Sequence, residues 1–225
     1  MGQSRFIIGI DLGTTNSALA YVDLADPAEQ PPIRLFQVPQ LIDAGKVANK
    51  PGLPSFLYQP GPHELPAGAT AVPWDEGRDF AVGTFARDQG SLVPARLVSS
   101  AKSWLCHPGV DRTAPQLPWQ APDDVPKISP LDASARYLEH LRDAWNELIA
   151  ADDPFASLEG QEVYSNSLSW HGDPAFAQTV PIEQYRTQYS FLVPSTITYN
   201  YVNIIKPVGI GAPKVSLDGS SLPES

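Results

Sequence analysis

The chain has 225 residues, of which 42% are hydrophobic and 18% are charged, so it can bury a core in one or two domains. Its formal net charge of -10 argues against binding to nucleic acid or to an anionic membrane surface through bulk electrostatics. The single cysteine, Cys106, excludes an intramolecular disulfide, and no apolar run is long enough to span a bilayer. These features favour a cytoplasmic location.

The N-terminal segment combines an apolar strand with a polar turn. Residues 6–10 form a compact apolar run, which predicts a buried central strand. Residues 11–17 have the composition of a turn, and residues 18–22 resume a strand pattern. The segment therefore predicts a hairpin with a polar tip.

Short elements are predicted in the next part of the chain. Many of the 24 prolines lie between residues 27 and 130, which predicts irregular connections at the surface. Short strands are predicted at residues 33–37, 54–58 and 80–83, the last of them followed by a helix through Ala86. Leu97, Ala101 and Leu105 recur every fourth residue, and this spacing predicts a short helix over residues 97–105.

A long helix is predicted from Pro130 to about Ala150. Ser129 suits the N-cap position, Pro130 suits the first helical position, and Asp132 completes a capping box. We expect His140 on the polar side of this helix. The apolar stripe that we assign to the core consists of Leu131, Ala135, Leu138, Leu141, Trp145 and Leu148.

The composition changes after about Val163. Helix-forming residues become rare, and β-branched and aromatic residues alternate with other residues at 185–193 and 197–205. Residues 215–219 end in Asp-Gly, which is a hairpin signal. We therefore expect residues 164–225 to be all-β.

The turn at residues 11–17 offers the strongest chemistry in the sequence. Asp11 follows a buried strand, where one carboxylate can hold a hydrated Mg²⁺ ion. Gly13 allows the backbone to approach a phosphate closely. Thr14, Thr15 and Asn16 add hydroxyl, amide and backbone donors suited to an anion. The alternative is a polar β-turn without a ligand.

The run from Ile8 to Ser17 resembles the first phosphate motif of the 70-kilodalton heat-shock chaperones. Further segments resemble later elements of that family, at residues 53–56, 80–87, 100–105 and 128–130. The resemblance covers about residues 5–163. It implies an α/β fold class, as the first lobe of a partial actin-like, heat-shock-chaperone ATPase fold, followed here by the small all-β C-terminal segment.

The resemblance also implies roles for individual residues. Asp11 would organise Mg²⁺, residues Gly13, Thr14, Thr15 and Asn16 would bind the phosphates of ATP, and Lys102 would be catalytic. A lysine beside the γ-phosphate stabilises charge in the transition state; the alternative for Lys102 is an ordinary solvated lysine on a helix. Unfolded polypeptides or co-chaperones would be the partners.

The resemblance stops near Val163, beyond which the family's second phosphate motif, adenosine motif and peptide-binding domain are not found. We therefore expect weak or no ATP binding by this chain alone, and no hydrolysis. About residues 168–222 resemble instead the bacterial domain similar to IgG-Fc-binding proteins, on blocks that include residues 172–175, 181–194 and 215–219. Domains of that kind are β-rich and are associated with the cell surface.

Two hypotheses from different classes follow. The first is a divergent, truncated, ATP-binding chaperone-like protein with a partial ATPase domain at residues 1–163 and an incomplete β-rich segment at 164–225. The second is a non-enzymatic fusion or truncated chain whose β-rich tail is a binding module of the cell surface. The sequence leaves open whether the two parts are a genuine fusion or a joined reading frame.

Overall fold

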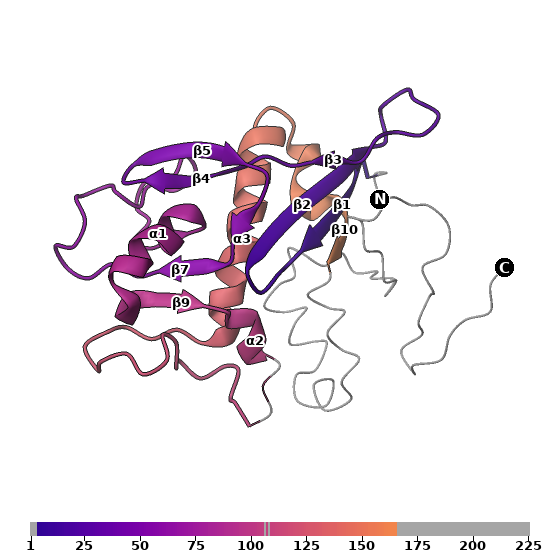
Figure 1. Ribbon diagram of the computed structural model, residues 1–225. Helices are drawn as coiled ribbons and strands as arrows, with labels where there is room; N and C mark the ends of the chain where they lie inside the picture. The colour runs from indigo at the N-terminus through magenta and orange to yellow at the C-terminus, as the bar shows by residue number, and fades with distance from the viewer. Residues whose placement is uncertain (1–3, 106, 108, 166–225) are drawn as a thin grey trace.

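The computed structural model describes residues 4–105, 107 and 109–165 (Figure 1). The strands are β1 (Phe6–Asp11), β2 (Asn16–Asp23), β3 (Arg34–Leu35), β4 (Val38–Asp43), β5 (Lys46–Lys50), β6 (Leu53–Pro54), β7 (Phe56–Tyr58), β8 (Ala81–Val82), β9 (Leu97–Ser99) and β10 (Glu162–Ser165). The helices are α1 (Thr84–Leu92), α2 (Ala101–Leu105) and α3 (Pro130–Ile149), with short 3-10 turns η1 (Pro94–Arg96), η2 (Pro154–Ala156) and η3 (Leu158–Gly160).

The largest sheet has the strand order β10-β1-β2-β3, and β6 also pairs with β2. β1 and β2 form an antiparallel hairpin in which Phe6 lies opposite Asp23 and Asp11 lies opposite Ala18. β10 pairs with the other side of β1 in the parallel direction. The predicted N-terminal hairpin with a polar tip is therefore confirmed, and its first strand is central.

Two smaller sheets lie beyond the hairpin. β4 and β5 form a second antiparallel hairpin, which the sequence did not predict, and Gly45 turns it with a φ of 64°. β7 lies between β8 and β9 in a three-stranded sheet. α1 lies beside these two sheets in Figure 1. Their shared small core consists of Leu41, Tyr58, Val72, Ala81, Phe85 and Ala86.

The helix predicted over residues 97–105 is wrong for its first half. Residues 97–99 form β9, in which Val98 lies opposite Leu57 of β7. Ser100 then adopts a φ of 55°, a left-handed conformation that separates the strand from α2. The spacing of Leu97, Ala101 and Leu105, four residues apart, suited a helix, but pairing with a neighbouring strand determined the local structure.

The long helix is confirmed as α3, with the predicted cap. The Ser129 hydroxyl accepts a hydrogen bond from the Asp132 backbone N–H at 2.9 Å and donates one to the Asp132 carboxylate at 2.7 Å. The predicted stripe is buried except for Leu148, which is 48% exposed. None of the helices in the described part of the chain has the length and apolarity that crossing a bilayer requires.

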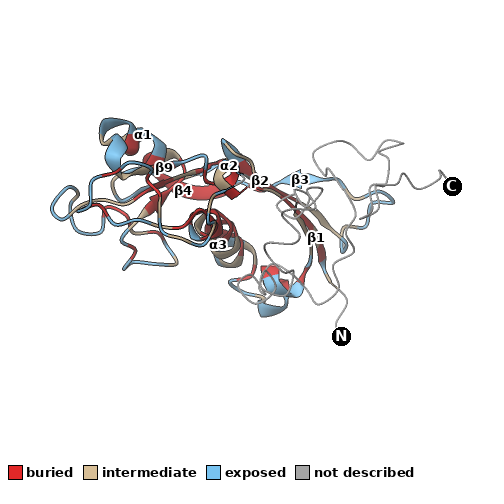
Figure 2. Ribbon diagram, turned by 90° about the horizontal axis from the view of Figure 1, so that it is seen from below, coloured by how far each residue is buried: buried red, intermediate tan, exposed pale blue. Residues whose placement is uncertain are grey.

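α3 has a buried side, which is red in Figure 2, and its Trp145 belongs to the main core. Its ring centroid is 5.2 Å from that of Phe6, 5.1 Å from that of Tyr21 and 5.5 Å from that of Phe36. Its indole N–H donates to the Ala156 carbonyl at 2.9 Å. The buried tryptophan thereby connects α3, the main sheet and η2, with its polar atom satisfied.

His140 is buried at 2% exposure, so its expected place on the polar side of α3 is wrong. Its Nδ1 lies 3.0 Å from the Arg78 guanidinium and its Nε2 lies 2.9 Å from the Pro39 carbonyl. Because arginine can only donate, Nδ1 must accept, and Nε2 carries the proton and donates to Pro39. Burial, together with the charge of Arg78, lowers the pKa of His140 to about 3.

The expected fold class, the first lobe of an α/β actin-like ATPase, is wrong. The described residues form a β-rich structure of several small sheets with only three α-helices, of which α2 has five residues. A ten-residue motif of strand, turn and strand determines a hairpin, but it does not determine the topology around that hairpin. The expected all-β tail lies outside the described residues beyond Ser165.

The buried His140 predicts a specific pH dependence of stability. The unfolded imidazole takes up a proton near its ordinary pKa of about 6.5, whereas the folded one does so only near about 3. Between these pH values the unfolded state binds more protons, so this group makes the free energy of unfolding fall as the pH falls. The slope approaches about 1.4 kcal/mol per pH unit.

Urea unfolding between pH 7 and pH 4 measures this effect in the wild type and in the non-titrating variant His140→Gln. We expect the variant to be less stable at pH 7 but to lose less stability on acidification. His63→Gln, at an exposed histidine, is the matched control. Equal slopes for wild type and His140→Gln would contradict the buried, neutral imidazole.

Candidate functional site

The polar turn between β1 and β2 contains the residues that the sequence assigned to phosphate and metal binding. Thr15 and Asn16 are exposed, whereas Asp11, Gly13 and Thr14 are partly buried. The turn is tight, because a Cβ added at Gly13 would lie 2.0 Å from the Asn16 carbonyl oxygen. Only glycine therefore fits at that position.

Two residues that are distant in the sequence donate hydrogen bonds to carbonyl groups of this turn. Ser55 donates from its backbone N–H to the Thr15 carbonyl and from its hydroxyl to the Gly13 carbonyl, both at 2.8 Å. The buried ammonium group of Lys102 donates to the Leu12 carbonyl. The structure thus brings Lys102, from α2, to the turn, although 90 positions separate it from Leu12.

These contacts involve the carbonyl oxygens of the turn, not its N–H groups. The roles of Asp11 in holding Mg²⁺, of residues 13–16 in binding ATP phosphates and of Lys102 in catalysis stay predictions. Within the residues that the structure describes, no three or more His, Cys, Asp or Glu side chains are grouped so that they could hold a metal ion. Asp11, the one metal ligand that the sequence predicted, therefore does not belong to a group of three such side chains among the described residues.

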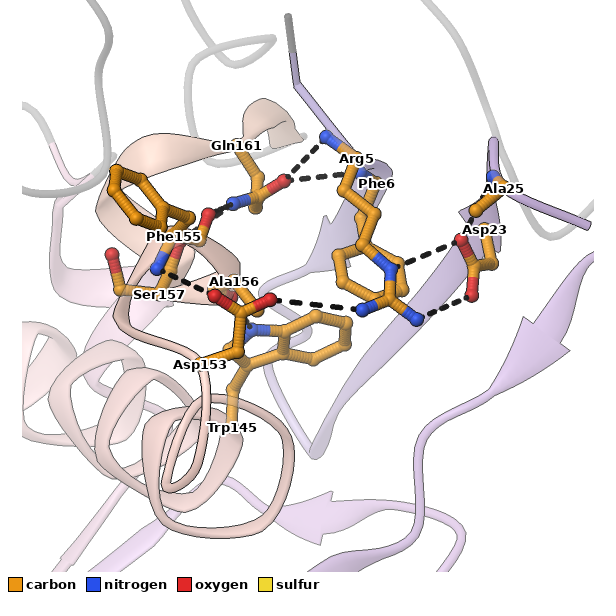
Figure 3. Close-up of polar contacts among 10 residues, drawn as sticks. All are labelled: Arg5, Phe6, Asp23, Ala25, Trp145, Asp153, Phe155, Ala156, Ser157 and Gln161. Carbon is orange, nitrogen blue, oxygen red and sulfur yellow. Dashed lines mark hydrogen bonds and ion pairs between the residues drawn. The ribbon is translucent and has the colours of Figure 1, made fainter. Parts of the chain in front are cut away.

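A second group of polar contacts fastens the segment after α3 to the start of β1 (Figure 3). The buried Gln161 accepts hydrogen bonds from the backbone N–H groups of Arg5 and Phe6, both at 3.0 Å. Its amide nitrogen donates to the carbonyls of Phe155 and Ser157 at 2.7 and 3.0 Å. One side chain therefore satisfies four backbone groups and sets β10 beside β1.

Arg5 adds ion pairs to the contacts between the segment after α3 and the start of β1 (Figure 3). Its guanidinium lies 3.2 Å from the Asp23 carboxylate and 3.7 Å from the Asp153 carboxylate. Burial alone would raise the pKa of Asp23, but hydrogen bonds from Arg5 and Ala25 lower it below its ordinary value. Since Arg5 is half exposed, these ion pairs add little stability beside the bonds of Gln161.

Phe155, in the segment after α3, projects into solvent and is 91% exposed. Its backbone is nevertheless fixed, because its N–H donates to the Asp153 carboxylate at 3.1 Å and its carbonyl accepts from Gln161. A large apolar ring exposed on a fixed backbone is suited to contact with a protein partner. Sequence reasoning missed Phe155; the available signal was the turn-initiating Asp153-Pro154 pair before it.

Comparison with protein families gives a match at this end of the chain. Residues 137–225 match the IgGFc binding protein family. The match begins inside α3, includes η2, η3 and β10, and covers less than half of the chain. It overlaps residues 168–222, for which the sequence resembles the same family. A search of curated proteins finds no match.

The resemblance of residues 5–163 to the heat-shock chaperones is overturned by these comparisons. No chaperone or ATPase family matches the chain, and the small β-sheets are not the expected lobe. An ATP-binding, chaperone-like protein of the actin-type fold is therefore the wrong reading of the turn motif. The clients and co-chaperones that the resemblance implied have no support, and the proposed domain boundary at Val163 stays a prediction.

The tight turn predicts that Gly13→Ala destabilises the protein. The new methyl group would overlap the Asn16 carbonyl, so the hairpin must distort, at a cost of about 1–3 kcal/mol. Gly77→Ala is the matched control, because the nearest atom to a Cβ there is 3.8 Å away. Urea unfolding measures both variants; a Gly13→Ala protein as stable as the Gly77→Ala protein would show that the turn is not constrained.

Because the Gln161 side chain makes four hydrogen bonds to the backbone, we expect Gln161→Ala to be destabilising. The substitution leaves the buried N–H group of Phe6 and the partly buried N–H group of Arg5 without this acceptor, and an unsatisfied buried group costs about 1–3 kcal/mol. We expect a lower midpoint of urea unfolding and faster amide exchange of β1. Gln30→Ala, at an exposed position, is the control. Unchanged exchange in β1 would exclude Gln161 as the fastening between β10 and β1.

Proposed function

We propose that this chain is a non-enzymatic protein-binding module that acts at the cell surface or after secretion, and that residues 137–225 bind the Fc part of immunoglobulin G. The observation that carries this proposal is the family match over those residues. The ligand is taken from the printed name of that family. The location is taken from the association of such domains with the cell surface.

The described part of the matched range supports a binding role. Phe155 lies within it and exposes 91% of its surface on a backbone that Asp153 and Gln161 hold in place. Aromatic side chains are enriched among the residues that dominate protein–protein binding energies, and a segment whose backbone is already held in place loses less entropy on binding. Leu148, in the same range, adds a second exposed apolar side chain.

Attachment to a rigid base favours the same role. Gln161 and Trp145 fasten the matched range to the main sheet, so Phe155 is presented from a fixed support. Binding residues are commonly placed on short connecting segments that a rigid scaffold positions. The segment from η2 to η3 has this arrangement, and β1 and α3 are its scaffold.

Surface plasmon resonance of the full chain over immobilised Fc fragment tests the proposal. We expect saturable binding to Fc and no binding to the Fab fragment at the same surface density. Phe155→Ala should weaken Fc binding by about tenfold or more, which corresponds to about 1.4 kcal/mol or more for an aromatic contact at an interface.

Leu92→Ala is the matched control, because Leu92 is 74% exposed but lies in α1, outside the matched range. It should bind Fc as tightly as the wild type does. Circular dichroism checks that both variants are folded. Equal signals on Fc and Fab, or no signal on either, would contradict the proposed ligand. If Phe155→Ala leaves the affinity for Fc unchanged, Phe155 does not contribute to the interface.

A further inference from the structure

The main sheet has two faces, and its sequence is apolar on both. β1 reads Phe-Ile-Ile-Gly-Ile, and β2 contains Ala-Leu-Ala-Tyr-Val, so apolar side chains continue through successive positions and do not alternate with polar ones. Strands of this kind occur where both faces of a sheet are covered. A sheet with one face in water would show polar residues at every second position.

One face packs against α3. Phe6, Ile8 and Ile10 of β1 and Leu19 of β2 belong to the main buried core, together with the buried side of α3. Trp145 contacts this face directly through Phe6 and Tyr21. The register agrees, because Ile8 lies opposite Tyr21 and Ile10 lies opposite Leu19, and opposite residues point to the same side.

The other face contains the remaining members of the same pairs. Ile7 lies opposite Val22, Gly9 lies opposite Ala20, and Ala20 lies opposite the exposed Leu35 of β3. We call Ile7, Gly9, Ala18, Ala20, Val22 and Leu35 the second sheet face. It continues onto β10, where Tyr164 lies opposite Gly9. The acidic residue that adjoins this face is Asp11, which lies opposite Ala18 at the end beside the polar turn.

The residues of this face lie outside the two packed core clusters of the described chain. Among residues 4–105, 107 and 109–165, neither of the two buried clusters includes a residue of the second sheet face. Gly9 and Ala20 are buried, Ile7, Ala18 and Val22 are half-buried, and Leu35 is 47% exposed. A strand pair with this composition is stable when something apolar covers it.

The course of the chain points to the occupant. The described residues end at Ser165, at the end of β10, so residues 166–225 continue directly from an edge of this same sheet. That segment also has a suitable composition, since every second residue over 185–193 and 197–205 is aromatic or β-branched, except Asn203. A short connection from β10 would bring such residues over the neighbouring face without crossing another element.

We propose that residues 166–225 pack against the second sheet face, so that the family-matched range and the N-terminal hairpin share one core. This inference goes beyond the proposed function, because it concerns the support of the module and not its ligand. Under this proposal, the predicted domain boundary at Val163 falls inside β10, within the main sheet.

Site-specific photo-cross-linking in the full chain tests the packing. The photoreactive residue benzoylphenylalanine replaces Val22 on the second sheet face, or Val47 of β5 as a control, since Val47 is a partly exposed strand valine outside this sheet. Irradiation of an equal mixture of ¹⁵N-labelled and unlabelled protein, followed by mass spectrometry, separates cross-links within one chain from those between chains.

We expect the probe at position 22 to cross-link mainly to residues 166–225 of its own chain, and the probe at position 47 not to do so. Cross-links between labelled and unlabelled chains would overturn the proposal in favour of a second copy on this face. Cross-links confined to residues 4–165, or none, would overturn it by showing the face covered by described residues or open to water. Fc is absent from the experiment, so its outcome is separate from that of the binding test.

Hydrogen exchange gives a second measurement. Val22→Lys places a charge on the second sheet face, and amides of residues 166–225 should then exchange about tenfold faster. Val47→Lys should leave their exchange unchanged. Equal exchange in the two variants, both shown to be folded by the protection of α3, would contradict the proposed packing.

Discussion

Gln161 joins two ends of the described chain through both sides of its amide. Its oxygen accepts the N–H groups of Arg5 and Phe6, while its nitrogen donates to Phe155 and Ser157. This arrangement brings β10 alongside β1 in the parallel direction and leaves η2 where the buried indole of α3 can bond to it. The parallel edge of the main sheet and the position of η2, with its exposed aromatic side chain, depend on these four hydrogen bonds.

The sequence predicted correctly those elements whose structure depends on residues close together in the chain. The N-terminal hairpin follows from two apolar runs around turn residues, and α3 follows from the capping box of Ser129 and Asp132. The prediction over residues 97–99 was wrong because the helical spacing of apolar residues contains no information about β7, with which Val98 pairs. The left-handed Ser100 between strand and helix had no sequence signal of the kind that glycine gives.

Contacts between distant parts of the chain could not be predicted in the same way. The pattern of α3 assigned His140 to the polar side, because its partners Arg78 and the Pro39 carbonyl are far away in the sequence. Lys102 does meet the turn at Leu12, but that proximity does not establish a chemical role. The resemblance to a chaperone rested mainly on the turn itself, and a tight turn that requires glycine is compatible with many folds.

The pairing of β10 with β1 has a consequence for synthesis of the protein. Gln161 follows Phe6 by 155 positions, so the first strand leaves the ribosome long before its parallel neighbour and before α3 exist. At about 5–20 residues per second, that interval is roughly 8 to 30 s. During it the β1–β2 strand pair, which is apolar on both faces, lacks both α3 and β10. The nascent chain is therefore most exposed to wrong pairing at its beginning, until α3 and β10 have been synthesised.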